Sequence, residues 1–200
     1  ASVVGRDYLL IKNMMKTREI LQNASEAAAS LHMISDQTVS QVLREVASAL
    51  RDATEAILTA NQLDLVRMCP DNPKYDRLKL TPERIDGIAS DMENVAGLSS
   101  PLGRVISEAL RPNGMKITKI SVPFGVVGVI YEARPNVTAD VFSLCFRSGN
   151  VCVLKGGSDA DDSSRAIVAV IHEVLLRYDV DPAVCTLLPP DREATAELLG

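Results

Sequence analysis

Apolar residues recur at steps of three and four through the first half of the chain, the spacing of one buried helix face. The clearest stripe begins after Asp36 and predicts a long helix. Its members are Val39, Val42, Leu43, Val46, Leu50, Ala53, Ile57 and Leu58. The alanine-rich, charged segment Thr17–Leu31 predicts another helix before it. We therefore expect residues 14–103 to form a mainly helical part.

The segment before the next helix is rich in turn-forming residues. Met68–Lys79 contains two prolines and an Asp-Asn pair, which predicts a loop. Thr81 then suits the N-cap of a helix, and Pro82 suits its first position. Glu83 favours the positive end of the helix dipole. The apolar stripe that follows consists of Ile85, Ile88, Met92 and Val95.

The period of the pattern changes after residue 104. Val105–Leu110 and Met115–Val122 predict two strands around the turn Arg111–Gly114. The second strand alternates in part, as expected of a strand with one wet face. A two-stranded hairpin alone is marginal in water, so we expect the hairpin at 104–122 to pack against something else.

From residue 123 to residue 200, strands and helices alternate, which predicts an α/β fold with a parallel sheet. The expected elements are strand 126–131, helix 135–148, strand 151–154, helix 160–177, strand 183–188 and a helix from 191. The first two strands are continuous apolar runs, as in sheets buried on both faces. Three strands make a thin sheet, so we expect the fold to be incomplete in this chain.

Composition excludes several classes of protein. Apolar residues make up 46%, enough for a substantial core, and the net charge of −5 argues against a general nucleic-acid binder. No segment approaches the ~20 apolar residues that cross a bilayer, and the N-terminus has no long apolar region typical of a signal peptide. The pair Met14-Met15 suggests a natural start, which would make residues 1–13 an extra segment.

The four cysteines, Cys69, Cys145, Cys152 and Cys185, do not form a metal-binding or disulfide pattern. No pair has C-x-x-C spacing, and Cys152 and Cys185 lie in apolar, strand-like contexts where a thiol acts as a small hydrophobe. We therefore interpret them as structural, and we expect a reducing, cytoplasmic environment.

Candidate chemistry follows the strand at Val151–Leu154. Lys155 comes directly after it, and Gly156-Gly157-Ser158 would let a ligand approach the backbone closely. Acidic residues at 159, 161 and 162 would repel a pyrophosphate docked on the next helix, so a nucleotide should lie across the sheet edge. An ordinary turn with a solvated lysine explains the pattern equally well.

The other strand end, Glu132–Asn136, leaves several interpretations open. Arg134 suits a phosphate or carboxylate. Glu132 and Arg134 would equally make a structural ion pair, and Asn136 would suit a helix cap. Gly125 and Gly128 favour close backbone packing over nucleotide binding, because neither a G-x-G-x-x-G motif nor a Walker A motif is present.

Taken together, these motifs resemble the gamma-glutamyl phosphate reductase family, within the aldehyde dehydrogenase superfamily. The matching segments are Pro123–Asn136 (PFGVVGVIYEARPN), Ser148–Asn150 (SGN), Val153–Ser158 (VLKGGS), Arg111–Gly114 (RPNG), Leu78–Arg84 (LKLTPER) and Ala60–Asp64 (ANQLD). The similarity runs from about Met15 to the last residue. It implies an aldehyde-dehydrogenase-like fold, with N-terminal helices and a Rossmann-like parallel sheet covered by helices on both faces.

The resemblance implies NADPH-dependent reduction of L-glutamyl 5-phosphate to L-glutamate 5-semialdehyde in proline biosynthesis. In that family a cysteine thiolate displaces phosphate, and hydride then reduces the thioester. The family also implies a homodimer or higher homo-oligomer, which the hairpin at 104–122 helps to build. It implies no nucleic-acid or membrane partner.

The resemblance assigns Lys155, Gly156, Gly157 and Ser158 to the cofactor, together with the Glu132-Ala133 pair. NAD-using superfamily members often carry an acidic residue where this chain has Ser158. A carboxylate ~4 Å from a 2′-phosphate would cost about 4 kcal/mol at an effective dielectric of 20, so serine favours NADPH over NADH.

The oxyanion donor of the superfamily has two candidate positions in this chain. A gapless count from the glycines of the first strand places it at Arg134, and a two-residue gap places it at Asn136. None of the four cysteines matches the family's nucleophile motif, which lies farther along the family's sequence. The chain therefore carries no catalytic residue of its own by this comparison, and we expect these 200 residues to be inactive alone.

Two other functions remain open from the sequence. A stand-alone nucleotide-binding or interaction module without catalysis would use the same sheet edge. The chain would equally suit the reductase part of a bifunctional synthetase with a kinase ahead of it.

Overall fold

The computed structural model describes residues 17–200, so the proposed extra segment 1–13 and the start at Met14 lie outside the described residues. The helices are α2 (Thr17–Leu31), α3 (Asp36–Asp52), α4 (Thr54–Val66), α5 (Tyr75–Leu78), α6 (Pro82–Gly97), α7 (Pro135–Arg147), α8 (Asp161–Arg177) and α9 (Arg192–Leu199). The strands are β1 (Val105–Leu110), β2 (Lys116–Ile120), β3 (Val126–Ile130), β4 (Val151–Lys155) and β5 (Cys185–Leu187). Two 3-10 turns, η1 (Ser158–Ala160) and η2 (Pro182–Val184), complete the order.

The predicted cap and apolar stripes of the first half are confirmed. Thr81 caps α6 by accepting a hydrogen bond from the N–H of Arg84. Ser35, which the sequence analysis did not single out, caps α3. The apolar faces of α3 and α6 pack together in the core. The long stripe is not one helix, however, because the chain bends at Ala53 and α4 begins. This bend carries α4 across to α8, on which it packs.

The prediction of a loop at Met68–Lys79 is wrong for its last residues, which form a single helical turn, α5, shortly before α6. Leu78 is fully buried in this turn and packs with Leu65. The buried side chain of Asn61 holds the segment in place: its amide donates to the Leu78 carbonyl at 2.9 Å, and its oxygen accepts from the Leu80 N–H at 2.8 Å. These tertiary contacts outweigh the local turn composition.

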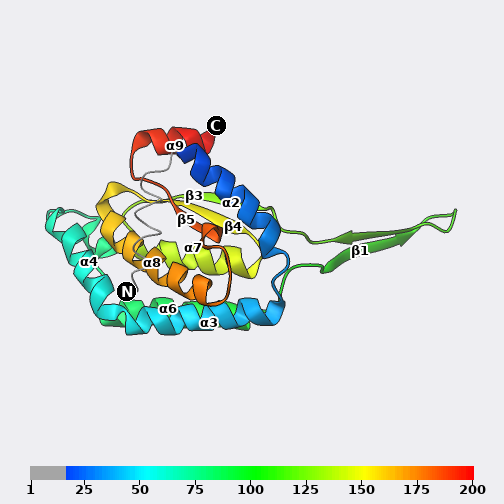
Figure 1. Cartoon of the computed structure of the whole chain (residues 1–200), viewed down its shortest axis with the longest axis horizontal. Coiled ribbons are helices and arrows are strands. Elements are labelled where there is room, and N and C mark those ends of the chain that lie inside the picture. Colours follow the sequence, from blue (N-terminus) through cyan, green and yellow to red (C-terminus); the bar gives the residue numbers. More distant parts are fainter. Residues whose placement is uncertain (1–16) are drawn as a thin grey trace.

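The sheet is parallel in the order β3-β4-β5, as the alternation of elements predicted. Figure 1 shows helices on both faces, with α2 and α9 on one side and α7 and α8 on the other. All five residues of β4 are buried, as its continuous apolar run predicted. The same prediction is wrong for β3, whose residues alternate between exposed and half-buried because β3 is the edge strand of the sheet. β5 is shorter than predicted because its first residues form η2, where Asp181 caps the turn.

The two glycines of the first strand have different roles. A Cβ on Gly128 would lie 3.1 Å from the Leu198 side chain of α9, so close packing is confirmed there. Gly125 has open space around it, and packing is the wrong explanation for this residue. Its φ of +103° is a backbone conformation that favours glycine.

The hairpin forms as predicted, and Figure 1 shows it extending away from the body of the molecule. β1 and β2 pair antiparallel, and every residue of both strands is exposed. Several exposed side chains are large and apolar, including Val105, Ile106, Leu110, Ile117 and Ile120. Within the described chain the hairpin therefore has no packing partner. No helix among residues 17–200 has the length and apolar character needed to cross a bilayer.

Candidate functional site

The two strand ends singled out in the sequence lie side by side. The Tyr131 N–H donates to the Lys155 carbonyl at 3.1 Å, which continues the pairing of β3 with β4 beyond Ile130. A Cβ on Gly156 would lie 3.5 Å from the Tyr131 hydroxyl, and one on Gly157 would lie 4.0 Å from Cα of Glu132. The segments 131–134 and 155–158 thus form one edge of the sheet.

Lys155 is not the solvated lysine of an ordinary turn. It is only 5% exposed, and its ammonium donates to the Gly156 carbonyl at 2.9 Å. An ammonium group has three donors, so this bond leaves two for a ligand. The cation is therefore held against the glycine turn that follows β4.

Glu132 and Arg134 do not form the structural pair that was one alternative. The Glu132 carboxylate accepts from Lys74 at 3.1 Å, and Lys74 also lies 3.9 Å from Asp159. Between the two residues, Ala133 has a φ of +43°, in the left-handed region of backbone conformation. A buried alanine in this conformation stores roughly 1–2 kcal/mol of strain.

Asn136 does not cap α7, which was the other structural alternative. The helix begins one residue earlier, with Pro135 in its first turn and Arg134 at the N-cap without a side-chain cap bond. Asn136 lies inside the helix, and its amide nitrogen donates to Asp140 at 3.0 Å. One N–H of this amide is thereby occupied, and the Arg134 side chain has no ion pair or hydrogen bond to any residue from 17 to 200.

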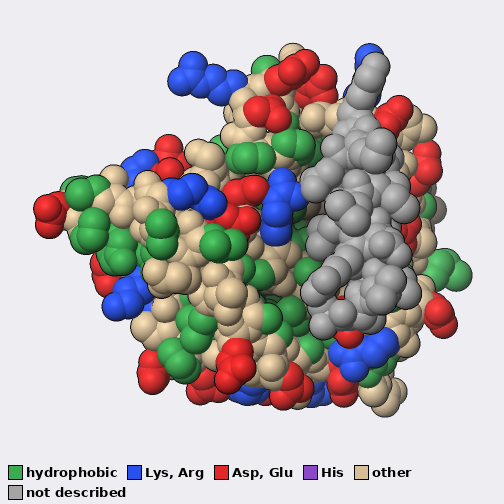
Figure 2. All heavy atoms as spheres, turned by 60° about the vertical axis from the view of Figure 1, so that its left-hand side comes forward, with side chains coloured by type: hydrophobic (Ala, Val, Ile, Leu, Met, Phe, Trp, Pro, Cys, Tyr) green, Lys and Arg blue, Asp and Glu red, His purple; other side chains and the backbone are tan. Residues whose placement is uncertain are grey.

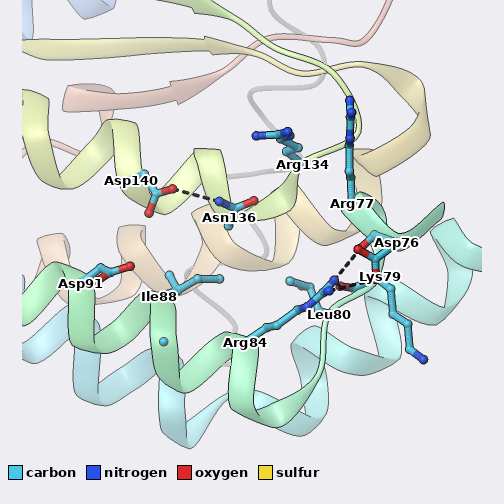
Figure 3. A pocket seen from close by; sticks show the side chains of 11 residues that line it. Asp76, Arg77, Lys79, Leu80, Arg84, Ile88, Asp91, Arg134, Asn136 and Asp140 are labelled. Carbon is cyan, nitrogen blue, oxygen red and sulfur yellow. Dashed lines mark hydrogen bonds and ion pairs between the residues drawn. The ribbon is translucent and has the colours of Figure 1, made fainter. Parts of the chain in front are cut away.

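Arg134 and Asn136 line a cavity of about 350 Å³ that the sequence did not predict. Figure 3 shows the cavity between α5, α6 and the N-terminal half of α7. Its other lining residues are Asp76, Arg77, Lys79, Leu80, Arg84, Gly87, Ile88, Asp91 and Asp140. No local motif marks Arg77, Asp91 or Asp140, because they meet only when α6 packs on α7.

The charged residues of this cavity include one ion pair and one carboxyl group whose pKa is shifted. Arg84 is already bound: it contacts the Asp76 carboxylate at 2.9 Å and the Lys79 carbonyl at 2.7 Å. Burial raises the pKa of Asp140, the nearby charge of Asp91 adds to this effect, and the bond from Asn136 opposes it. The ionised form of Asp140 is therefore held at a free-energy cost.

Ser158 and Asp159 line a second hollow, of about 290 Å³, beside the loop after α4. Figure 2 shows this side of the molecule, where basic and acidic side chains lie next to one another around a hollow. The buried Asp64 carboxylate accepts from the N–H groups of Asp162 at 3.2 Å and Ser163 at 2.8 Å. Burial raises the pKa of Asp64, while its hydrogen bonds from Ser163 oppose this. Asp64 therefore caps α8 from another helix.

Comparison with known proteins places this geometry in a family. No family model matched the chain. A gamma-glutamyl phosphate reductase from Parabacteroides distasonis is 67% identical over 186 residues, 93% of this chain. The crystal structure of gamma-glutamyl phosphate reductase from Thermotoga maritima superposes with a TM-score of 0.87 at 32% identity, over 92% of this chain. Over 93% of its own length, the chain matches the gamma-glutamyl phosphate reductase family.

The chain spans only part of its relatives in this reductase family. It covers 45% of the Parabacteroides protein and 46% of the Thermotoga chain. More distant structures share the fold alone. They include a probable aldehyde dehydrogenase from Listeria monocytogenes, with a TM-score of 0.70 at 14% identity, and a glyceraldehyde-3-phosphate dehydrogenase from Methanocaldococcus jannaschii complexed with NADP, with a TM-score of 0.69 at 17% identity. The aldehyde-dehydrogenase-like fold is thus confirmed.

The cysteines of this chain occupy structural positions. Cys145, Cys152 and Cys185 are buried, and only Cys69 is exposed. Contacts with Cys145 and Cys185, together with burial, raise the pKa of the Cys152 thiol, which disfavours the reactive thiolate. Among residues 17–200 no three side chains of His, Cys, Asp or Glu gather as a metal site would require.

Proposed function

We propose that this chain is the cofactor-binding part of a cytoplasmic reductase that converts L-glutamyl 5-phosphate to L-glutamate 5-semialdehyde with NADPH, in proline biosynthesis. The observation that carries the proposal is the contact between the Lys155–Ser158 turn and the loop that presents Arg134. Ligands of parallel sheets collect at this carboxyl edge. The similarity to gamma-glutamyl phosphate reductases supplies the reaction.

The residues at the sheet edge fit a nicotinamide dinucleotide. Glycine at 157 keeps the space beside Glu132 open, where a Cβ would otherwise project. The Ser158 side chain is exposed, and its hydroxyl makes no hydrogen bond to the described residues. Lys155 would contact the adenosine ribose, and Ser158 would accommodate a 2′-phosphate without like-charge repulsion. When bound, NADPH would supply the hydride.

The cavity beside Arg134 would hold the acyl phosphate. A guanidinium without a protein partner suits a phosphate or a carboxylate, since its fork matches two oxygens at once. Either Arg134 or the remaining N–H of Asn136 would stabilise the developing oxyanion. The nucleophilic cysteine that forms the thioester would come from the part of the family's sequence that this chain does not span.

The exposed hairpin would join two copies of the complete protein. Its apolar side chains have no partner within residues 17–200, and exposed apolar surface of this kind marks an interaction site. A homodimer or higher homo-oligomer would cover them. Residues 14–103, 104–122 and 123–200 would then serve as the helical part, the assembly hairpin and the cofactor part.

Activity should require the complete protein. With L-glutamate 5-semialdehyde, NADP and inorganic phosphate, we expect the complete protein to form NADPH at a rate that depends on phosphate. The isolated 200-residue chain should form none, because it lacks the nucleophile. Absorbance at the NADPH band measures the rates of both proteins. Circular dichroism checks that the isolated chain is folded. Phosphate-independent turnover, or turnover by the isolated chain, would contradict the proposal.

A further inference from the structure

Apart from the ion pair between Arg84 and Asp76, the charges that line the cavity between α6 and α7 are separated along its length. Figure 3 shows Arg77 and Arg134 near the start of α7, whereas Asp91 and Asp140 lie farther along the two helices. Neither guanidinium group has a hydrogen bond or ion pair to another residue of 17–200. A cavity that presents cations at one end and carboxylates at the other fits a ligand that carries both charges.

The acidic end comes from two helices. Asp91 belongs to α6 and Asp140 to α7, and the two are close enough for the charge of Asp91 to raise the pKa of Asp140. Asn136 lies one turn before Asp140 on the same face of α7 and fixes its carboxylate through the 3.0 Å hydrogen bond. No ion pair links a Lys or Arg of the described chain to either carboxylate. The Asp140 carboxylate is therefore held in one orientation, and neither carboxylate has a basic partner among residues 17–200.

The spacing suits an amino-acid phosphate. Asp140 follows Arg134 by six residues, which corresponds to about 9 Å along a helix axis. An extended five-carbon amino acid with a terminal phosphate spans a comparable distance between its ammonium group and its phosphate. The same ligand could thus reach both ends of the cavity.

We propose that Asp140, assisted by Asp91, binds the α-ammonium group of the substrate, while Arg134 and Arg77 bind its anionic groups. The cavity would then select acyl phosphates that carry a free α-amino group. This inference rests on the proposed function and adds a specificity-determining residue to it. Asn136 acts as a positioning residue for Asp140.

The stability of the protein should also respond to Asp140. A carboxyl group whose pKa is higher in the folded state stabilises the fold while it is protonated, and this contribution is lost as pH rises through the folded pKa. At neutral pH the ionised group is therefore a net cost, and Asp140→Asn should raise the melting temperature. An ionised carboxylate kept at such a cost is typical of a binding site.

The test compares two aldehydes in the complete protein, with NADP and inorganic phosphate. One is L-glutamate 5-semialdehyde, and the other is 5-oxopentanoate, which lacks only the α-amino group. The wild-type protein should prefer the amino compound, and Asp140→Asn should lower its kcat/KM about tenfold to a hundredfold, as expected for loss of a charged hydrogen bond. The same variant should leave kcat/KM for 5-oxopentanoate within about twofold.

Two variants control for other effects of the substitution. Arg134→Ala should lower kcat/KM for both aldehydes and preserve their ratio, because both are converted to acyl phosphates. Asp52→Asn removes the same charge from an exposed position at the end of α3 and should change neither value. The inference is wrong if the wild type has equal kcat/KM for the two aldehydes, or if Asp140→Asn lowers kcat/KM for both by the same factor. A wild-type protein that turns over neither aldehyde would overturn the proposed function itself.

Discussion

Replacing Ser158 with glutamate should lower kcat/KM for NADPH by about a thousandfold in the complete protein and change kcat/KM for NADH by less than tenfold. A carboxylate about 4 Å from the 2′-phosphate would add about 4 kcal/mol of repulsion at an effective dielectric of 20, and each 1.4 kcal/mol corresponds to a factor of ten. The substitution should be tolerated structurally, because Ser158 is exposed at the rim of the hollow beside η1.

A glutamine at the same position separates charge from size. Ser158→Gln should lower kcat/KM for NADPH by no more than about tenfold, since it adds the same bulk without repulsion. Steady-state kinetics at saturating semialdehyde and phosphate give kcat/KM for each cofactor with the wild type and the two variants. Equal losses with NADPH and NADH in the glutamate variant would mean that Ser158 does not lie beside the 2′-phosphate.

Replacing Asp64 with alanine should destabilise the protein by about 3 kcal/mol. The side chain of Asp64 is fully buried, and its loss would leave the N–H groups of Asp162 and Ser163 without an acceptor at the start of α8. The ion pair of Asp64 with Arg67 contributes less, because Arg67 is 54% exposed and its charge is screened by water.

Hydrogen exchange measures the effect of the substitution locally, at the start of α8. The amides of Asp162 and Ser163 should exchange faster in Asp64→Ala, and the melting temperature should fall. Glu55→Ala removes a carboxylate from an exposed position on the same helix and should change stability by less than about 0.5 kcal/mol. Unchanged exchange at the two amides would show that Asp64 does not hold the start of α8.

The order of helices and strands could be predicted because local sequence patterns determine it. Apolar stripes at helical spacing, the Thr81-Pro82 start and the apolar runs at β3 and β4 each depend on neighbours in sequence. The break at Ala53 and the helical turn of α5 could not be predicted this way. Both depend on contacts with distant residues, such as the bonds from Asn61 to Leu78 and Leu80.

The candidate site was predictable only at the strand ends. Lys155 and Arg134 follow apolar runs that form neighbouring parallel strands, so the sequence alone brings them to one edge of the sheet. The conformation of Ala133, which separates Glu132 from Arg134, gives no signal in the sequence. Asp91 and Asp140 lie 49 positions apart and meet only through the packing of α6 on α7, so a single sequence cannot pair them.

The position of bound NADP in the complete protein shows whether residues 155–158 form the cofactor site. A crystal structure of that complex should place the adenosine 2′-phosphate within hydrogen-bonding distance of Ser158 and the adenosine ribose beside Lys155. The nicotinamide should lie toward the loop that carries Arg134. A cofactor bound away from residues 155–158, or no binding at this edge of the sheet, would contradict the account.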